Sequence, residues 1–303
     1  MKPPFLALTL LIAVALLSGC LDFERETVTY HHDAKGDTLR LFLVYNGIFG
    51  ADGRDGLSEQ EQAQLAEMLA GDRAFFFSNW IFEYNRASLK KELENLNDPD
   101  QTRDKPNDLV VREKKFLELL LANVRVDNGP FFYDANHRLC AAQRVTVQNV
   151  TDLLRAANEL MRAGLRHKAG AEGTDENERQ VILKSLANEG AFLRLTGNRF
   201  SLRWPLTGED FESSFGRGDN QQAKIILGEF NRQGGHLGWE KGEIFTHIGA
   251  TNNAHTTLTL PVSGKPYKPN AVAAIALRAQ LTVLEKFDAP AAAKAFVATG
   301  KVP

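Results

Sequence analysis

The chain has 303 residues, of which 43% are hydrophobic and 24% charged, a composition typical of a folded protein with one large core or two modest ones. It carries 36 Lys and Arg residues against 38 Asp and Glu residues, a formal net charge of −2. This balance lacks the basic surplus of a nucleic-acid-binding protein, so no nucleic-acid partner is expected.

Residues 1–20 have the pattern of an export signal that ends in a lipid-attachment sequence. Lys2 supplies the positive start, residues 5–17 carry no charge, and the small residues Ser18 and Gly19 precede Cys20. This pattern resembles the signal peptides of bacterial lipoproteins. The resemblance implies that the chain is cut before Cys20, that the Cys20 thiol carries diacylglycerol, and that the new amino group carries an acyl chain such as palmitate. No other cofactor is predicted.

Two alternatives exist for this segment. A transmembrane anchor needs about 20 apolar residues to cross a hydrocarbon core of about 30 Å, and residues 5–17 are too few. A signal peptide that is cleaved while Cys20 stays unmodified is the second alternative. Lipidation is preferred because Cys20 directly follows Leu-Ser-Gly, and it leaves Cys140 without a partner for an intrachain disulfide.

The short segment after Cys20 places the folded part close to a membrane. Residues 20–26 are expected to be the lipidated cysteine and a short tether, since six extended residues reach roughly 20 Å. Leu21 is not the aspartate that accompanies inner-membrane retention of Gram-negative lipoproteins. A lipid-anchored location in the cell envelope is therefore expected, at the outer membrane if the source is Gram-negative.

The rest of the chain repeats one order of elements, two strands followed by a helix. Each strand pair flanks a turn rich in Asp, Asn or Gly, and each helix begins near a capping residue, Ser58, Asn149 or Thr207, with an acid three residues later. The expected strand pairs are 27–33 with 38–45, 131–133 with 138–147, and 191–195 with 199–204. This order predicts an α+β fold with an antiparallel sheet of β-hairpins and packed helices. Whether the three ββα units are true repeats is left open.

A helical pair is expected to interrupt this pattern at about residues 80–125. Residues 81–96 and 109–124 read as helices around a charged, solvated loop, either within one domain or at a boundary near Asn107. A single domain over residues 27–303 is preferred. Later helices are expected after Thr174, from Gln221, over 270–287, and from Asp288-Ala289-Pro290.

One Gly-rich stretch gathers residues that suit a metal ion. His236, Glu243, His247 and His255 combine imidazole and carboxylate, which are ligands of zinc and similar ions. Their spacing follows no ligand motif, and the glycines predict turns and short strands there. Histidines on an ordinary surface loop are the alternative, so these residues are weak metal candidates.

An aromatic cluster lies at residues 75–84. Such a cluster usually belongs to a core, but exposed rings would form a platform for a sugar chain, a peptide or a partner protein. The candidate binding surface consists of Trp80 and Tyr84, extended by Trp239. Cys140, inside a predicted strand, reads as a small buried hydrophobe.

These features favour a membrane-anchored envelope lipoprotein that binds an envelope protein or polymer without catalysing a reaction. The alternative is an exported hydrolase of an envelope polymer, including a metal-dependent one that would use residues 236–255. Catalytic residues cannot be assigned from the sequence.

Overall fold

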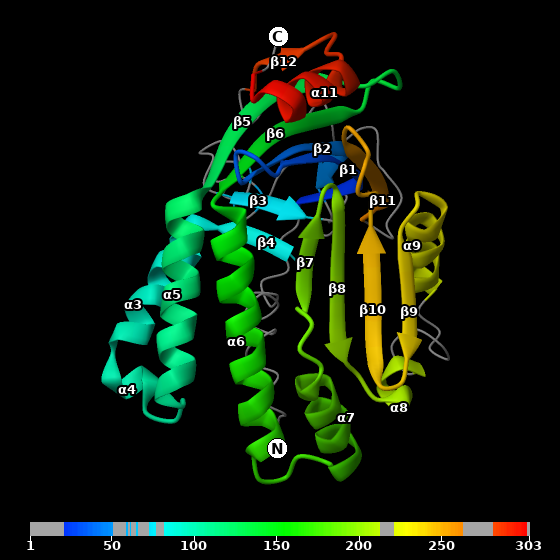
Figure 1. The fold of residues 1–303 in the computed structure, drawn as a ribbon. Coiled ribbons are helices and arrows are strands. Elements are labelled where there is room, and N and C mark those ends of the chain that lie inside the picture. The colour runs from blue at the N-terminus through cyan, green and yellow to red at the C-terminus, as the bar shows by residue number, and fades with distance from the viewer. Residues whose placement is uncertain are drawn as a thin grey trace. The chain divides into compact units, whose positions relative to one another are not determined.

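The computed structural model describes residues 21–50, 59, 61, 65, 73–76, 82–212, 221–262 and 281–301. Within these residues, β-hairpins build sheets and helices pack beside them, which confirms the predicted α+β class (Figure 1). No helix in the described part of the chain is long and apolar enough to cross a membrane.

The described chain divides into two compact units. Unit 1 contains the described residues within 88–123 and 149–253, and unit 2 contains those within 21–87, 124–148 and 254–301. The chain therefore passes between the units several times. The single domain expected over residues 27–303 stays a prediction.

Unit 2 is built on a six-stranded sheet with the strand order β11-β1-β2-β6-β5-β12. All neighbouring strands are antiparallel except β12, which runs parallel to β5. The strands are β1 (Leu21–Asp33), β2 (Thr38–Gly50), β5 (Val124–Tyr133), β6 (Leu139–Gln148), β11 (Thr256–Pro261) and β12 (Val283–Leu284). Both hairpins expected in this part of the chain are confirmed; β1, β2 and β5 are longer than predicted, and β6 is shifted by one residue.

The first strand corrects the expected tether. β1 begins at Leu21, which pairs with Gly50 of β2, so residues 21–26 belong to the sheet. The many charges of this segment conceal the strand pattern in the sequence. Two of these charged residues have defined places in the sheet: Glu26 is fully buried opposite Tyr45, and Glu24 forms an ion pair with Arg138.

One face of this sheet packs on the C-terminal helix α11 (Ala289–Thr299). Phe42 and Val44 of β2 and Cys140 of β6 form a core with Phe296 of α11. The predicted start of the helix is confirmed, because the Asp288 side chain accepts a hydrogen bond from the Ala291 N–H.

The helix expected over 270–287 is wrong where the structure describes it. Residues 270–280 lie outside the described residues. Val283 and Leu284 form strand β12, because they pair with Phe131 and Phe132 at the edge of β5. A short apolar pair fits a sheet edge as well as it fits a helix, and the long-range partner decides between them.

A buried polar network ties the other face of the sheet to the hairpin of β3 (Arg73–Phe76) and β4 (Phe82–Asn85). The Tyr45 hydroxyl donates to Gln143 Oε1 at 2.7 Å and accepts from the Phe75 N–H at 3.0 Å. Gln143 Nε2 in turn donates to Asn128 Oδ1 at 2.8 Å and to the Arg73 carbonyl at 3.0 Å. Burial raises the pKa of Tyr45 well above its ordinary value, so the hydroxyl remains a donor.

The helical pair is confirmed, with a later start. Residues 82–85 form β4 instead of helix, and the pair consists of α3 (Arg86–Asn97) and α5 (Asn107–Asn123) joined by the short α4 (Pro99–Thr102). Leu96 of α3 packs with Val110 and Leu117 of α5. The charged connection is partly ordered by an ion pair of 3.1 Å between Lys105 and Glu113.

Helix α6 (Val150–Gly170) follows the second hairpin as predicted, but its cap differs from the expectation. Asn149 has a left-handed backbone with φ of 50°, and its side chain donates to Asn123 Oδ1 instead of capping the helix. Unit 1 also contains α7 (Glu176–Ala187), α8 (Gly208–Phe211) and α9 (Gln221–Arg232). The expected cap at Thr207 is confirmed, because its hydroxyl accepts from the Asp210 N–H. Ser58 lies outside the described residues.

A four-stranded antiparallel sheet completes unit 1. Its order is β7-β8-β10-β9, with β7 (Leu193–Thr196), β8 (Arg199–Pro205), β9 (His236–Glu240) and β10 (Glu243–Ile248). The hairpin expected at residues 191–204 is confirmed, as are the short strands of the Gly-rich stretch. Gly197 has a φ of +55°, and a Cβ there would lie 2.0 Å from the Thr251 carbonyl oxygen, so this turn requires glycine.

Candidate binding surface on the four-stranded sheet

Two of the predicted histidines face each other across this sheet. His236 of β9 is the register partner of His247 of β10, and the centroids of their rings lie 5.2 Å apart. The ring of Phe245 lies 5.5 Å from that of His236. Antiparallel pairing therefore joins two residues that are eleven positions apart in the sequence.

The histidine pair continues a row that crosses all four strands. His247 is also the register partner of Ser201 on β8, and Ser201 is the partner of Arg194 on β7. Directly paired residues point to the same face of a sheet, so Arg194, Ser201, His247 and His236 share one face. We call these four residues the cross-strand row.

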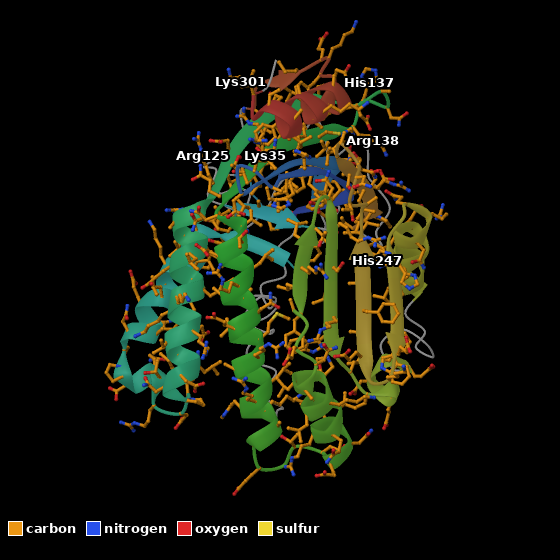
Figure 2. The ribbon with its side chains drawn as sticks, in the orientation of Figure 1. Lys35, Arg125, His137, Arg138, His247 and Lys301 are labelled. Carbon is orange, nitrogen blue, oxygen red and sulfur yellow. The ribbon has the colours of Figure 1, made fainter. Side chains whose placement is uncertain are left out.

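Arg199 lies beside this row on the same face, two residues before Ser201 on β8. Desolvation, the positive charge of Arg199 and the neighbouring His236 together lower the pKa of His247. His247 is consequently neutral over more of the pH range than an ordinary histidine. Figure 2 labels His247 on strand β10 of this sheet.

The other two metal candidates do not join the histidine pair in a ligand cluster. Glu243 Oε1 accepts hydrogen bonds from Arg203 at 2.6 Å and from the Ser185 hydroxyl at 2.5 Å. His255 precedes β11 and belongs to unit 2. The described residues contain no group of three or more His, Cys, Asp or Glu side chains arranged to hold a metal ion.

The role of Glu243 is structural, because its partner Arg203 organises the connection between α7 and β7. Arg203 donates to the carbonyl oxygens of Asn188 and Ala191, both at 3.1 Å. Arg162 of α6 reaches the same connection, and the ring of Phe192 lies 4.4 Å from the Arg203 guanidinium and 5.3 Å from that of Arg162. The sequence does not reveal this pair of arginines at the α7–β7 connection, because Arg162 and Arg203 are far apart in the chain.

The predicted aromatic surface divides between surface and core. Trp239 is 38% exposed, and its ring stacks on Phe211 with centroids 6.1 Å apart while Nε1 donates to the Leu206 carbonyl at 2.8 Å. Tyr84 is only 7% exposed and its hydroxyl accepts from Arg86, so the core alternative holds for this residue and its assignment to an exposed platform is wrong. Trp80 lies outside the described residues.

The structure describes Cys140 but not Cys20. Cys140 is fully buried in the sheet of unit 2, and burial raises the pKa of its thiol to about 11, which confirms its interpretation as a small core residue. Cys20 lies outside the described residues, immediately before the first residue of β1.

The chain has no match among known proteins to assist these assignments. No family model matches it, and the searches of curated proteins and of solved structures found no significant similarity.

Proposed function

We propose that this chain is a lipid-anchored protein of the bacterial cell envelope that acts as a non-enzymatic binding or assembly component. The lipid-attachment sequence ending at Cys20 is the observation that carries the proposal. The acyl chains on Cys20 hold the protein at the membrane, with about 0.8 kcal/mol from each buried methylene. An outer-membrane location is favoured for a Gram-negative source, because Leu21 replaces the retention aspartate.

The start of β1 at Leu21 supports a very short anchor. Consecutive Cα atoms lie about 3.8 Å apart, so the lipidated residue is one step from a strand that pairs along its whole length with β2. The turn between β5 and β6 lies at this end of the sheet, because Arg138 forms an ion pair with Glu24. The turn around Lys35 lies at the other end of β1, and the side chains of both turns are labelled in Figure 2.

The exposed face of the four-stranded sheet supports the binding role. It offers a row of cationic and polar side chains. The exposed ring of Trp239, whose register partner is Ile244, lies on the opposite face of β9 and is a separate candidate contact. Sheet faces of this kind present flat, preorganised contact area to a partner protein or an envelope polymer.

In-cell crosslinking followed by affinity purification of the tagged, lipidated protein tests the proposal. A stoichiometric partner that is lost in Cys20→Ala is the expected result. Trp239→Ala is expected to reduce the amount of crosslinked partner, and Trp204→Phe, a milder change at a half-buried position of the same sheet, serves as the control. Recovery of the wild-type protein without any protein or polymer bound to it would contradict the proposal.

One observation favours the second candidate function, an exported hydrolase. The lowered pKa of His247 leaves its imidazole unprotonated, and so able to accept a proton, at lower pH than an ordinary histidine. Release of fragments from an envelope polymer by the purified protein, lost in His247→Gln, would favour the hydrolase, while the absence of release from all polymers tested would set it aside. Metal analysis of the same protein tests whether His236 and His247 hold an ion.

A further inference from the structure

The cross-strand row is longer than any small anion. Neighbouring strands lie about 4.8 Å apart, so the three steps from Arg194 on β7 to His236 on β9 span roughly 14 Å. Arg194, Arg199 and His236 are exposed, while Ser201 and His247 are half-buried between them. The row is thus a flat strip of donors within reach of solvent.

Charge is segregated along this face of the sheet. The row carries the guanidinium of Arg194, the imidazoles of His236 and His247 and the neutral hydroxyl of Ser201. Arg199 beside the row adds a second guanidinium. The acidic residues of the same face, Glu240 and Glu243, are register partners at the opposite end of β9 and β10. Glu243 is neutralised there by Arg203, and Glu240 lies 3.2 Å from the Lys241 ammonium. The end of the face that holds the row is therefore the cationic one.

We infer that the cross-strand row and Arg199 bind a linear acidic glycan. This inference rests on the proposed function, because an exported, membrane-anchored binding protein meets glycan chains on its own side of the membrane. Carboxylate groups repeated along a chain can contact the guanidinium of Arg194 and the imidazole of His236 at once, which a single small anion cannot do across roughly 14 Å. Ser201 and the half-buried ring of Phe245, which lies beside His236, offer a hydroxyl and an apolar surface to sugar rings.

Titration calorimetry of the lipidated protein in detergent micelles with polygalacturonate oligomers tests the inference. The Arg194→Gln, Arg199→Gln double variant is expected to bind about tenfold more weakly, since two exposed charge pairs contribute about 0.7 kcal/mol each. Raising the salt from about 0.1 M to about 1 M, which shortens the Debye length from about 10 Å to about 3 Å, is expected to weaken wild-type binding. Arg155→Gln is the matched control, because Arg155 is a 61% exposed arginine on α6 of the same unit.

The outcomes separate this inference from the proposed function. Equal affinity of the double variant and the wild type for polygalacturonate, or equal affinity of the wild type for the oligomer and for monomeric galacturonate, would overturn the acidic-glycan site. Binding of neutral dextran as tight as that of polygalacturonate would overturn it as well. In each case a partner crosslinked in a Cys20-dependent manner would leave the proposed function standing. Unchanged circular dichroism and thermal transition of the double variant exclude unfolding as the cause of lost binding.

Discussion

Replacing Tyr45 by Phe removes one oxygen atom from the centre of unit 2 and leaves its shape unchanged. The hydroxyl is buried, donates to Gln143 Oε1 at 2.7 Å and accepts from the Phe75 N–H at 3.0 Å. Without it, a backbone N–H of β3 loses its acceptor and a side-chain amide of β6 loses its donor. Both groups belong to buried residues, since Phe75 is 5% and Gln143 2% exposed.

The expected decrease in the free energy of unfolding follows from these two hydrogen bonds. A buried donor or acceptor left without a partner costs about 1–3 kcal/mol, and the two groups share one network, so we expect Tyr45→Phe to lower the free energy of unfolding by about 2–4 kcal/mol. That is a large part of the roughly 5–15 kcal/mol that stabilises a typical domain. Tyr133→Phe is the control, because Tyr133 is a half-buried residue on β5 of the same sheet.

Cys140 reports the unfolding of this unit directly. It is buried in the same sheet, and Cys20 is blocked when it carries the lipid, so the alkylation of Cys140 against urea concentration follows the opening of unit 2. We expect the urea concentration at half-maximal Cys140 alkylation to be well below that of the wild type for Tyr45→Phe, and close to that of the wild type for Tyr133→Phe. Equal midpoints for the two variants would refute the reasoning from the network.

Three further predictions concern the other parts of the account. Glu243→Gln should destabilise unit 1 by about 1–3 kcal/mol, because it leaves its partner arginine on β8 without a carboxylate, and exposed Glu240→Gln should not; equal stabilities of the two variants would contradict this. The Cys140 thiol, with a pKa of about 11, should be alkylated in the folded protein at pH 8 far more slowly than in urea and faster as the pH rises, and equal rates in both states would contradict its burial. A fluorophore on Asn136→Cys should be quenched by lipid-borne quenchers more than one on Lys35→Cys, because β1 separates the two turns by roughly 40 Å, and equal quenching would contradict the expected orientation.

Local signals in the sequence predict the hairpins well. In the first turn, Asp33 Oδ1 accepts from the N–H groups of Lys35 and Gly36, and in the second, Asp134 Oδ1 accepts from the N–H of Asn136. These Asx turns involve residues two or three positions apart, so their side-chain chemistry is readable without the fold. The same reason explains why the helix starts at Thr207 and Asp288 are predicted correctly.

The elements that were predicted incorrectly share one cause, which is strand pairing between segments that are far apart in the sequence. Residues 21–26 form a strand because they pair with β2 and β11. Residues 82–85 form a strand because they pair with β3. Propensity and local pattern do not contain this information.

The candidate site was predicted only in part for the same reason. His236 and His247 were singled out by residue type, but their neighbours Arg194, Arg199 and Ser201 follow from the strand register. The turn at residues 196–198 could have predicted the pairing within its own hairpin, while the order of the four strands required the fold. Residue type does not reveal the ion pair of Glu243 either, because its partner Arg203 is 40 residues away in the sequence.

Mass spectrometry of the N-terminal peptide of the protein purified from membranes tests the central claim most directly. The account predicts a chain that begins at Cys20, with diacylglycerol on the thiol and an acyl chain on the amino group. A mature chain that begins at another residue, or an unmodified Cys20 in protein released from the membrane without detergent, would contradict it.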